Sequence, residues 1–141
     1  MAELQLTEDG ERTLRESEGL CLSMNVSIQQ AEHLLGGALI VLSDGGVETV
    51  PDKAAVERAV EAIHGRGIER PSENVMPGPG MRQALNMTAG AVAQAGGTVI
   101  NALTIAMGTV VSGEVNPMFY MSLGMSREEL ETALQGIAKD D

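Results

Sequence analysis

The amino-acid sequence contains an internal repeat, and this repeat limits the possible folds more than any other feature. Residues 71 positions apart match in type through most of each copy. The matched pairs are Leu14 and Leu85, Ser27 and Thr98, Ala31 and Ala102, Leu34 and Ile105, and Gly37 and Gly108. Farther along, at an offset of 74, Val56, Val60 and Ile63 match Leu130, Leu134 and Ile137. Two similar units with large apolar faces are expected to pack together about a pseudo-twofold axis. The alternative is chance similarity, since helical periodicity alone produces many apolar matches.

Apolar residues recur at helical spacing in both copies, and capping residues precede several of these segments. In the first copy we expect helices over residues 8–24, 31–42 and 53–64, the second of them preceded by a capping box at Ser27–Gln30. In the second copy we expect helices over residues 81–95, 98–111, 117–123 and 127–138. Only residues 46–50 alternate as a strand would. The sequence therefore predicts an all-α protein, a duplicated helical unit of two pseudo-twofold-related bundles with about three to four helices each.

The chain length and its proline-rich middle predict how the repeat is organised. The 141 residues fit a single domain, 1–141. We divide it into half one at 1–67, a connector at 68–80 and half two at 81–141. The connector contains Pro71, Pro77 and Pro79 among glycines, a composition that excludes a regular helix.

The charge balance excludes one class of partner. The formal net charge is −11, with 20 acidic and 9 basic residues, and such a field repels the phosphate backbone of nucleic acids. Anionic lipid surfaces are disfavoured for the same reason. We therefore expect neither a nucleic-acid partner nor membrane binding. A basic partner or a basic unfolded segment is favoured. No leader sequence is recognised, so we expect a cytoplasmic location.

One long stretch without charge leaves a second hypothesis open. Residues 83–113 contain no charged side chain. A run of this length suggests a membrane span or a membrane-associated, purely structural helical protein. Gln94 and Asn101 interrupt the run, and Gly96-Gly97 divides it. Two buried helices joined by a turn at these glycines explain the stretch better.

The sequence contains no recognisable catalytic constellation. No Gly-x-x-x-x-Gly-Lys-Ser/Thr string is present, so we expect no ATPase chemistry. Cys21 falls on an apolar helical face, which is typical of a buried, inert thiol. His33 and His64 have no Ser or Cys partner pattern and no second ligand at metal spacing. We therefore expect no enzyme, no cofactor and no metal, and an uncharacterised enzyme is the last alternative.

Segments in both copies resemble the Clp N-terminal repeat domain, ClpC type, in order and spacing. In that family the second helix of each half opens with Thr-Glu-His and two hydrophobic residues, and residues 31–35 here read Ala-Glu-His-Leu-Leu. Residues 56–67 are similar to the family's end of half one. Further matches are Pro71 and Pro79 in the connector, Arg82 just after it, and Gly96, Gly108, Gly113 and Gly124 in half two. Two departures stand out: Leu103 and Thr104 replace the second Glu-His pair, and the short segment 43–51 lacks the small third helix of half one.

This resemblance implies a docking role. Such domains bind substrates or adaptors for a Clp-type unfoldase, and in ClpC-type relatives two glutamates hold the guanidinium of phosphoarginine. A carboxylate suits this ligand because it accepts a bidentate, charge-assisted hydrogen bond from the planar fork. Only Glu32 carries over, since Leu103 cannot accept such a bond. The resemblance thus indicates Glu32, His33 and Arg82 as candidate partner-binding residues, with Clp adaptors, substrates, unfoldase subunits or phosphoarginine-bearing segments as partners.

Several alternatives stay open at the level of sequence. Glu32 either binds a ligand or acts as a first-turn acid that stabilises the N-terminus of its own helix. His33 is expected to pack or hydrogen-bond at the helix start. The chain is either the N-domain of a larger unfoldase or a stand-alone relative that acts as a regulator or decoy.

Overall fold

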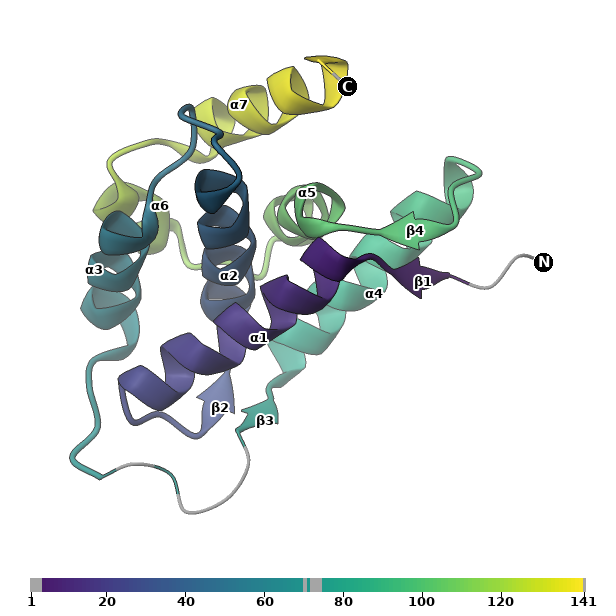
Figure 1. Cartoon of the computed structure of the whole chain (residues 1–141). Helices are drawn as coiled ribbons and strands as arrows, with labels where there is room; N and C mark the ends of the chain where they lie inside the picture. The colour runs from purple at the N-terminus through teal and green to yellow at the C-terminus, as the bar shows by residue number, and fades with distance from the viewer. Residues whose placement is uncertain (1–3, 70, 72–74, 141) are drawn as a thin grey trace.

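The computed structural model describes residues 4–69, 71 and 75–140, and these residues form an all-α protein (Figure 1). Half one contributes α1 (Glu8–Ser23), α2 (Ala31–Asp44) and α3 (Lys53–His64). Half two contributes α4 (Pro79–Gln94), α5 (Ala102–Ser112), α6 (Pro117–Leu123) and α7 (Arg127–Asp140). The predicted fold class is confirmed.

Four two-residue strands join the halves in a way that the repeat explains. They are β1 (Gln5–Leu6), β2 (Ile28–Gln29), β3 (Met76–Pro77) and β4 (Val99–Ile100). β1 pairs in parallel with β4, and β2 pairs in parallel with β3. An offset of 71 relates Gln5 to Met76 and Ile28 to Val99, so it converts one pair into the other. The strand that precedes the first helix of each half therefore pairs with a strand of the other half, as a pseudo-twofold arrangement requires.

The backbone hydrogen bonds follow the same symmetry. The N–H of Gln5 donates to the carbonyl of Thr98 at 2.9 Å, and the equivalent N–H of Met76 donates to Ser27 at 2.9 Å. Residues 46–50, whose alternation and short length leave a strand or a loop open in the sequence, form an irregular segment. Gly46 turns the chain there at φ 98°.

Two expected helix starts and one expected cap differ from the observed ones for local reasons. α4 begins at Pro79 rather than Met81, because proline fits the first helical position, where no backbone N–H is needed. α5 begins at Ala102 rather than Thr98, because residues 99–100 pair with β1 and Asn101 supplies the cap. The capping box of α2 is formed by Gln30 with a residue of its first turn, not by Ser27.

The core is centred on α2 and α5. Every residue of α2 from Ala31 to Leu42 is buried, and Leu34, Leu35 and Leu39 have no exposed surface. α1 crosses α2, α4 crosses α5, and α2 packs against α5 between the halves. The crossings are close because glycine lies at both: Gly37 meets α1 and Gly108 meets α4. In the last helix we expect Leu130, Leu134 and Ile137 to face inward; Leu130 and Leu134 are buried, and Ile137 is half-buried against the core.

The two halves differ at one element. α6 lies between α5 and α7 along the chain and packs against α3 of the other half, with Phe119 fully buried. The corresponding segment of half one, residues 45–52, contains no helix. The predicted absence of a small third helix in half one is confirmed.

The uncharged stretch forms two helices and not one continuous rod. α4 and α5 are separated by a turn at Gly96, whose φ is 79°, and by β4. In the described part of the chain, no helix combines the length and apolarity needed to cross a bilayer. α5 is largely buried as expected, but the second half of α4 is mostly exposed, which the sequence did not indicate.

Candidate functional site

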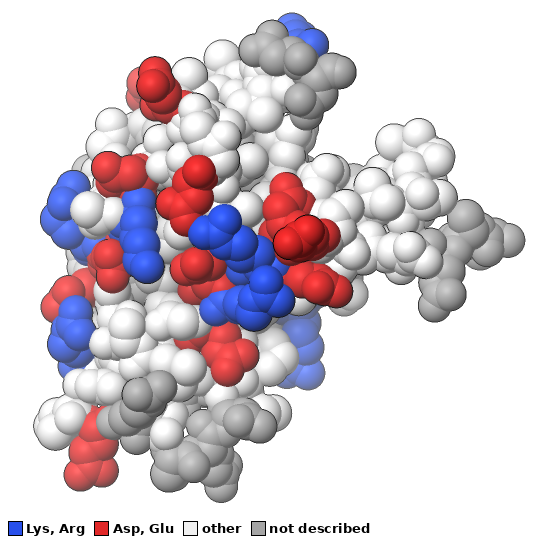
Figure 2. Space-filling view, in the orientation of Figure 1, with Lys and Arg blue, Asp and Glu red and all other residues white. Residues whose placement is uncertain are grey.

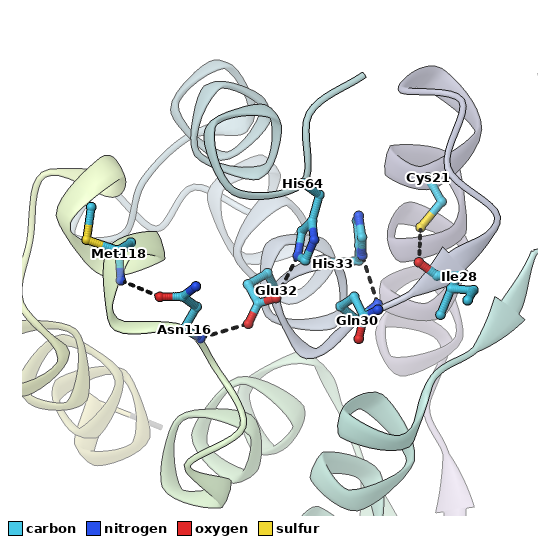
Figure 3. A network of polar contacts seen from close by, with 8 residues as sticks. All are labelled: Cys21, Ile28, Gln30, Glu32, His33, His64, Asn116 and Met118. Atoms are coloured by element: carbon cyan, nitrogen blue, oxygen red, sulfur yellow. Dashed lines mark hydrogen bonds and ion pairs between the residues drawn. The ribbon is translucent and has the colours of Figure 1, made fainter. Parts of the chain in front are cut away.

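Glu32 is held inside the protein by two hydrogen bonds (Figure 3). It lies in the first turn of α2 and is 4% exposed. Its Oε1 contacts Nε2 of His64, at the end of α3, at 2.6 Å. Its Oε2 accepts a hydrogen bond from the backbone N–H of Asn116, just before α6, at 2.8 Å. One carboxylate thus connects three elements from both halves.

His33 caps the helix that carries Glu32. It is 1% exposed, and its Nδ1 accepts the backbone N–H of Gln30 at 2.8 Å. Its ring stacks on that of His64 with centroids 4.8 Å apart, and its Nε2 has no partner among the described residues. In half two, Thr104 caps α5 equivalently by accepting the N–H of Asn101 at 2.9 Å. The replacement of His by Thr in the second copy therefore preserves the capping role.

The environment of His33 predicts a pH dependence of folding. Burial, and secondly the neighbouring His64, lower the pKa of His33 from 6.5 to about 4. Above pH 6.5 the ring is neutral in both states, whereas below it the unfolded chain binds the proton first. Stability should therefore fall by about 2 kcal/mol between pH 6.5 and 5. His33→Thr, which copies Thr104, should remove this part of the loss in urea unfolding. An equal loss in both proteins would contradict the assignment.

Arg82 and Glu32 occupy different environments. Arg82 is exposed in the first turn of α4, whereas Glu32 and His33 are buried. Glu32 is 4% exposed and both of its oxygens already accept hydrogen bonds, so a guanidinium would have to enter a buried site to reach it. Partner binding by Glu32, His33 and Arg82, and phosphoarginine binding in particular, stays a prediction.

A groove between α4 and α5 has an almost entirely apolar lining. Its volume is about 280 Å³. Met87, Ala91 and Ala95 line it on one side, and Met107, Gly108 and Val111 on the other. Val111 is 57% exposed and Met87 is 38% exposed. The hydroxyl of Thr88 in the groove donates to the carbonyl of Ala84, so its proton is not available to a ligand.

This groove belongs to the part of the chain that carries no charge. Figure 2 shows charged side chains over the rest of the visible face, whereas the lobe formed by the end of α4 and by β4 is white. The chain as a whole has a net charge of −11, so an exposed lobe without a single charge is unusual. The groove is therefore a candidate docking surface for an apolar ligand.

A second cavity, between α5, α6 and the start of α7, has a different character. Its volume is about 420 Å³, and Tyr120, Met121, Arg127 and Glu128 contribute to its lining. Burial raises the pKa of Tyr120 to about 12, so its hydroxyl remains protonated. Arg127 already pairs with Glu131 at 3.0 Å. This mixed lining is less suited to an apolar segment than the α4–α5 groove.

Solved structures with the same arrangement of helices identify the fold. The N-terminal domain of the caseinolytic-protease-associated chaperone ClpD from Arabidopsis thaliana superposes with a TM-score of 0.77 and 16% identity, covering 94% of this chain and 96% of that one. The Hsp104 N-terminal domain from Candida albicans superposes with a TM-score of 0.73 and 13% identity, covering 97% and 93%. The chain has the fold of a Clp N-terminal domain. No protein-family model and no curated protein matches its sequence.

Sequence reasoning missed the groove of this Clp N-terminal-domain fold. The uncharged stretch reads as two buried helices in the sequence. After Arg82, however, α4 carries no charged residue on any face through Gln94. A surface helix normally carries charge on its outer side. The absence of that charge was the available signal, and it became interpretable only when α4 was seen to be exposed.

Proposed function

We propose that this chain is a protein-recognition domain that binds apolar segments of other proteins in the α4–α5 groove. The observation that carries the proposal is an open, uncharged groove on a strongly acidic domain. Burial of Met87 and Val111 against a partner would remove apolar surface from water, which favours association by about 25 cal/mol per Å² before the costs of ordering. The role is one of binding and needs no catalytic group.

The partners we propose are substrates or adaptors of a Clp-type unfoldase. The fold supports this class, since its solved neighbours are N-terminal domains of ClpD and Hsp104. The net charge of −11 favours segments that carry basic residues beside their apolar ones. A stand-alone copy of the domain would compete with an unfoldase for such segments and act as a regulator or decoy.

Lysine in the groove tests this proposal. Val111→Lys and Met87→Lys should each weaken binding of fluorescently labelled, reduced and alkylated lysozyme by on the order of tenfold, because a charge would be buried against an apolar, basic ligand. Fluorescence anisotropy measures the affinity. The matched control is Met121→Lys, which alters an exposed methionine, 70% exposed, in the second cavity. The proposal fails if the wild-type chain does not bind, or if the control loses as much affinity as the groove variants.

A further inference from the structure

Methionine lines the α4–α5 groove from both of its helices. Met87 belongs to α4 and is 38% exposed, and Met107 belongs to α5 and is half-buried. The other residues of the lining are alanine, valine, glycine or threonine. Among these side chains, only the thioether of methionine is readily oxidised by a peroxide. The two sulfur atoms are therefore the chemically reactive atoms of the groove.

The groove has no hydrogen-bond donor for a polar group placed on those sulfur atoms. Thr88 and Thr104 carry the hydroxyls of the described lining. Thr88 donates its proton to the carbonyl of Ala84 at 2.9 Å, and Thr104 donates to the carbonyl of Asn101 at 3.0 Å. The backbone N–H groups along α4 and α5 are taken up by helical hydrogen bonds. An oxygen attached to either sulfur would thus depend on water for its hydrogen bonds.

Cys21 does not compete with these methionines for an oxidant. Its side chain has no exposed surface. Burial, and secondly the charge of Glu18, raise the pKa of the thiol to about 12, so the reactive thiolate is absent near neutral pH. A thioether reacts without first losing a proton. Exposed methionine is therefore the reactive form of sulfur in the described part of the chain.

We propose that Met87 and Met107 are oxidation sites through which a peroxide switches off ligand binding in the groove. This inference rests on the proposed function and adds a regulation of the same site. In the reaction with hydrogen peroxide, the sulfur donates a lone pair to one peroxide oxygen, so an S–O bond forms and the O–O bond breaks. The other oxygen leaves as water after taking up the proton. The sulfur loses two electrons, and the product is methionine sulfoxide.

The consequence for binding follows from the missing donors. In the empty groove, water can hydrogen-bond to the sulfoxide oxygen. An apolar ligand would displace that water and offer no donor in return, and the groove itself has none to supply. Burying an acceptor without a partner is unfavourable, so the oxidised groove should bind its ligand about tenfold more weakly. Enzymatic reduction of the sulfoxide would restore the original side chain.

Oxidation of the whole domain followed by a binding measurement tests the proposal. The chain is treated with hydrogen peroxide, catalase removes the excess, and peptide mass spectrometry locates the sulfoxides. Fluorescence anisotropy then gives the affinity for labelled, reduced and alkylated lysozyme before and after oxidation. One double variant combines Met87→Leu with Met107→Leu. Its matched control combines Met118→Leu with Met121→Leu, because these α6 methionines are 53% and 70% exposed and lie outside the groove.

The sensitivity of each variant is the ratio of its own affinities before and after peroxide, so a change in its basal affinity cancels. The wild type and the α6 variant are expected to lose about tenfold, and methionine sulfoxide reductase should reverse the loss. The groove variant should lose less than about twofold. Equal losses in the two double variants would overturn the inference. So would an unchanged affinity of wild type that carries sulfoxide at residues 87 and 107, or the absence of sulfoxide at both positions.

A second measurement needs no substitution. After partial oxidation, wild-type chains are passed over immobilised, reduced and alkylated lysozyme. Chains with sulfoxide at Met87 or Met107 should be depleted from the retained fraction, whereas chains with sulfoxide at Met118 or Met121 should be retained like the unmodified chain. Equal retention of both kinds would overturn the regulation and leave the proposed function intact. Failure of the unoxidised wild type to bind lysozyme would instead remove the proposed function itself.

Discussion

Alanine at Gly37 or at Gly108 is expected to lower the free energy of unfolding by about 3 kcal/mol and the melting temperature by about 10 °C. The added Cβ at Gly37 would lie 2.5 Å from the carbonyl oxygen of Thr13 and 2.8 Å from the backbone nitrogen of Ser17. At Gly108 it would lie 2.8 Å from Cα of Thr88. These atoms belong to the backbone of the crossing helix, so relief requires two packed helices to move apart.

The repeat supplies the matched controls. Gly19 in α1 and Gly90 in α4 are also 71 positions apart, and a Cβ on either would meet nothing within 4 Å. Both lie in helix interiors, so Gly19→Ala and Gly90→Ala should stabilise the protein by about 0.5–1 kcal/mol. Thermal and urea unfolding of the four single variants measure the contrast. The account of the helix crossings is wrong if the two crossing variants are as stable as the two control variants.

Glu32→Ala is expected to reduce the free energy of unfolding by about 3 kcal/mol, because Glu32 is an almost fully buried carboxylate with both oxygens bonded. Its removal leaves the Asn116 N–H without its acceptor and takes the partner from His64. Glu32→Gln should lose less, since its amide can still accept from Asn116 and donate to His64. Hydrogen exchange at the Asn116 amide should accelerate in the alanine variant.

The control for Glu32 is an exposed acid on α3. Glu61 pairs with Arg66 at 3.3 Å, and both side chains are about half exposed, at 48% and 51%. Exposed pairs contribute little, so Glu61→Ala should change stability by no more than about 0.5 kcal/mol. Equal effects of the two substitutions would show that Glu32 does not connect the halves in solution.

The repeat made most of the fold predictable. Matches such as Gly37 with Gly108 and Ala31 with Ala102 indicate two equivalent helix pairs, and the structure places them in equivalent positions. The start of α2 at Ala31 was predicted, but its cap was not, because it uses an uncommon residue. Gln30 with His33 is such a cap, and it was overlooked in favour of the more usual serine at position 27.

The candidate site was harder to predict because it depends on which faces remain uncovered. Glu32 stands out in the sequence, but only the fold shows that His64 and the Asn116 N–H occupy its oxygens. The groove was missed for the opposite reason. Its residues, such as Ala91 and Met107, read as core in the sequence, but in the structure they line an open groove.

Methionine-methyl NMR tests the recognition groove most directly. The chain contains nine methionines, with Met87 and Met107 in the groove and Met118 and Met121 on α6, where they are 53% and 70% exposed. Titration with reduced and alkylated lysozyme should shift the Met87 and Met107 methyl signals and leave those of Met118 and Met121 in place. Shifts of the two α6 methyl groups, with Met87 and Met107 unchanged, would place binding elsewhere and contradict the account.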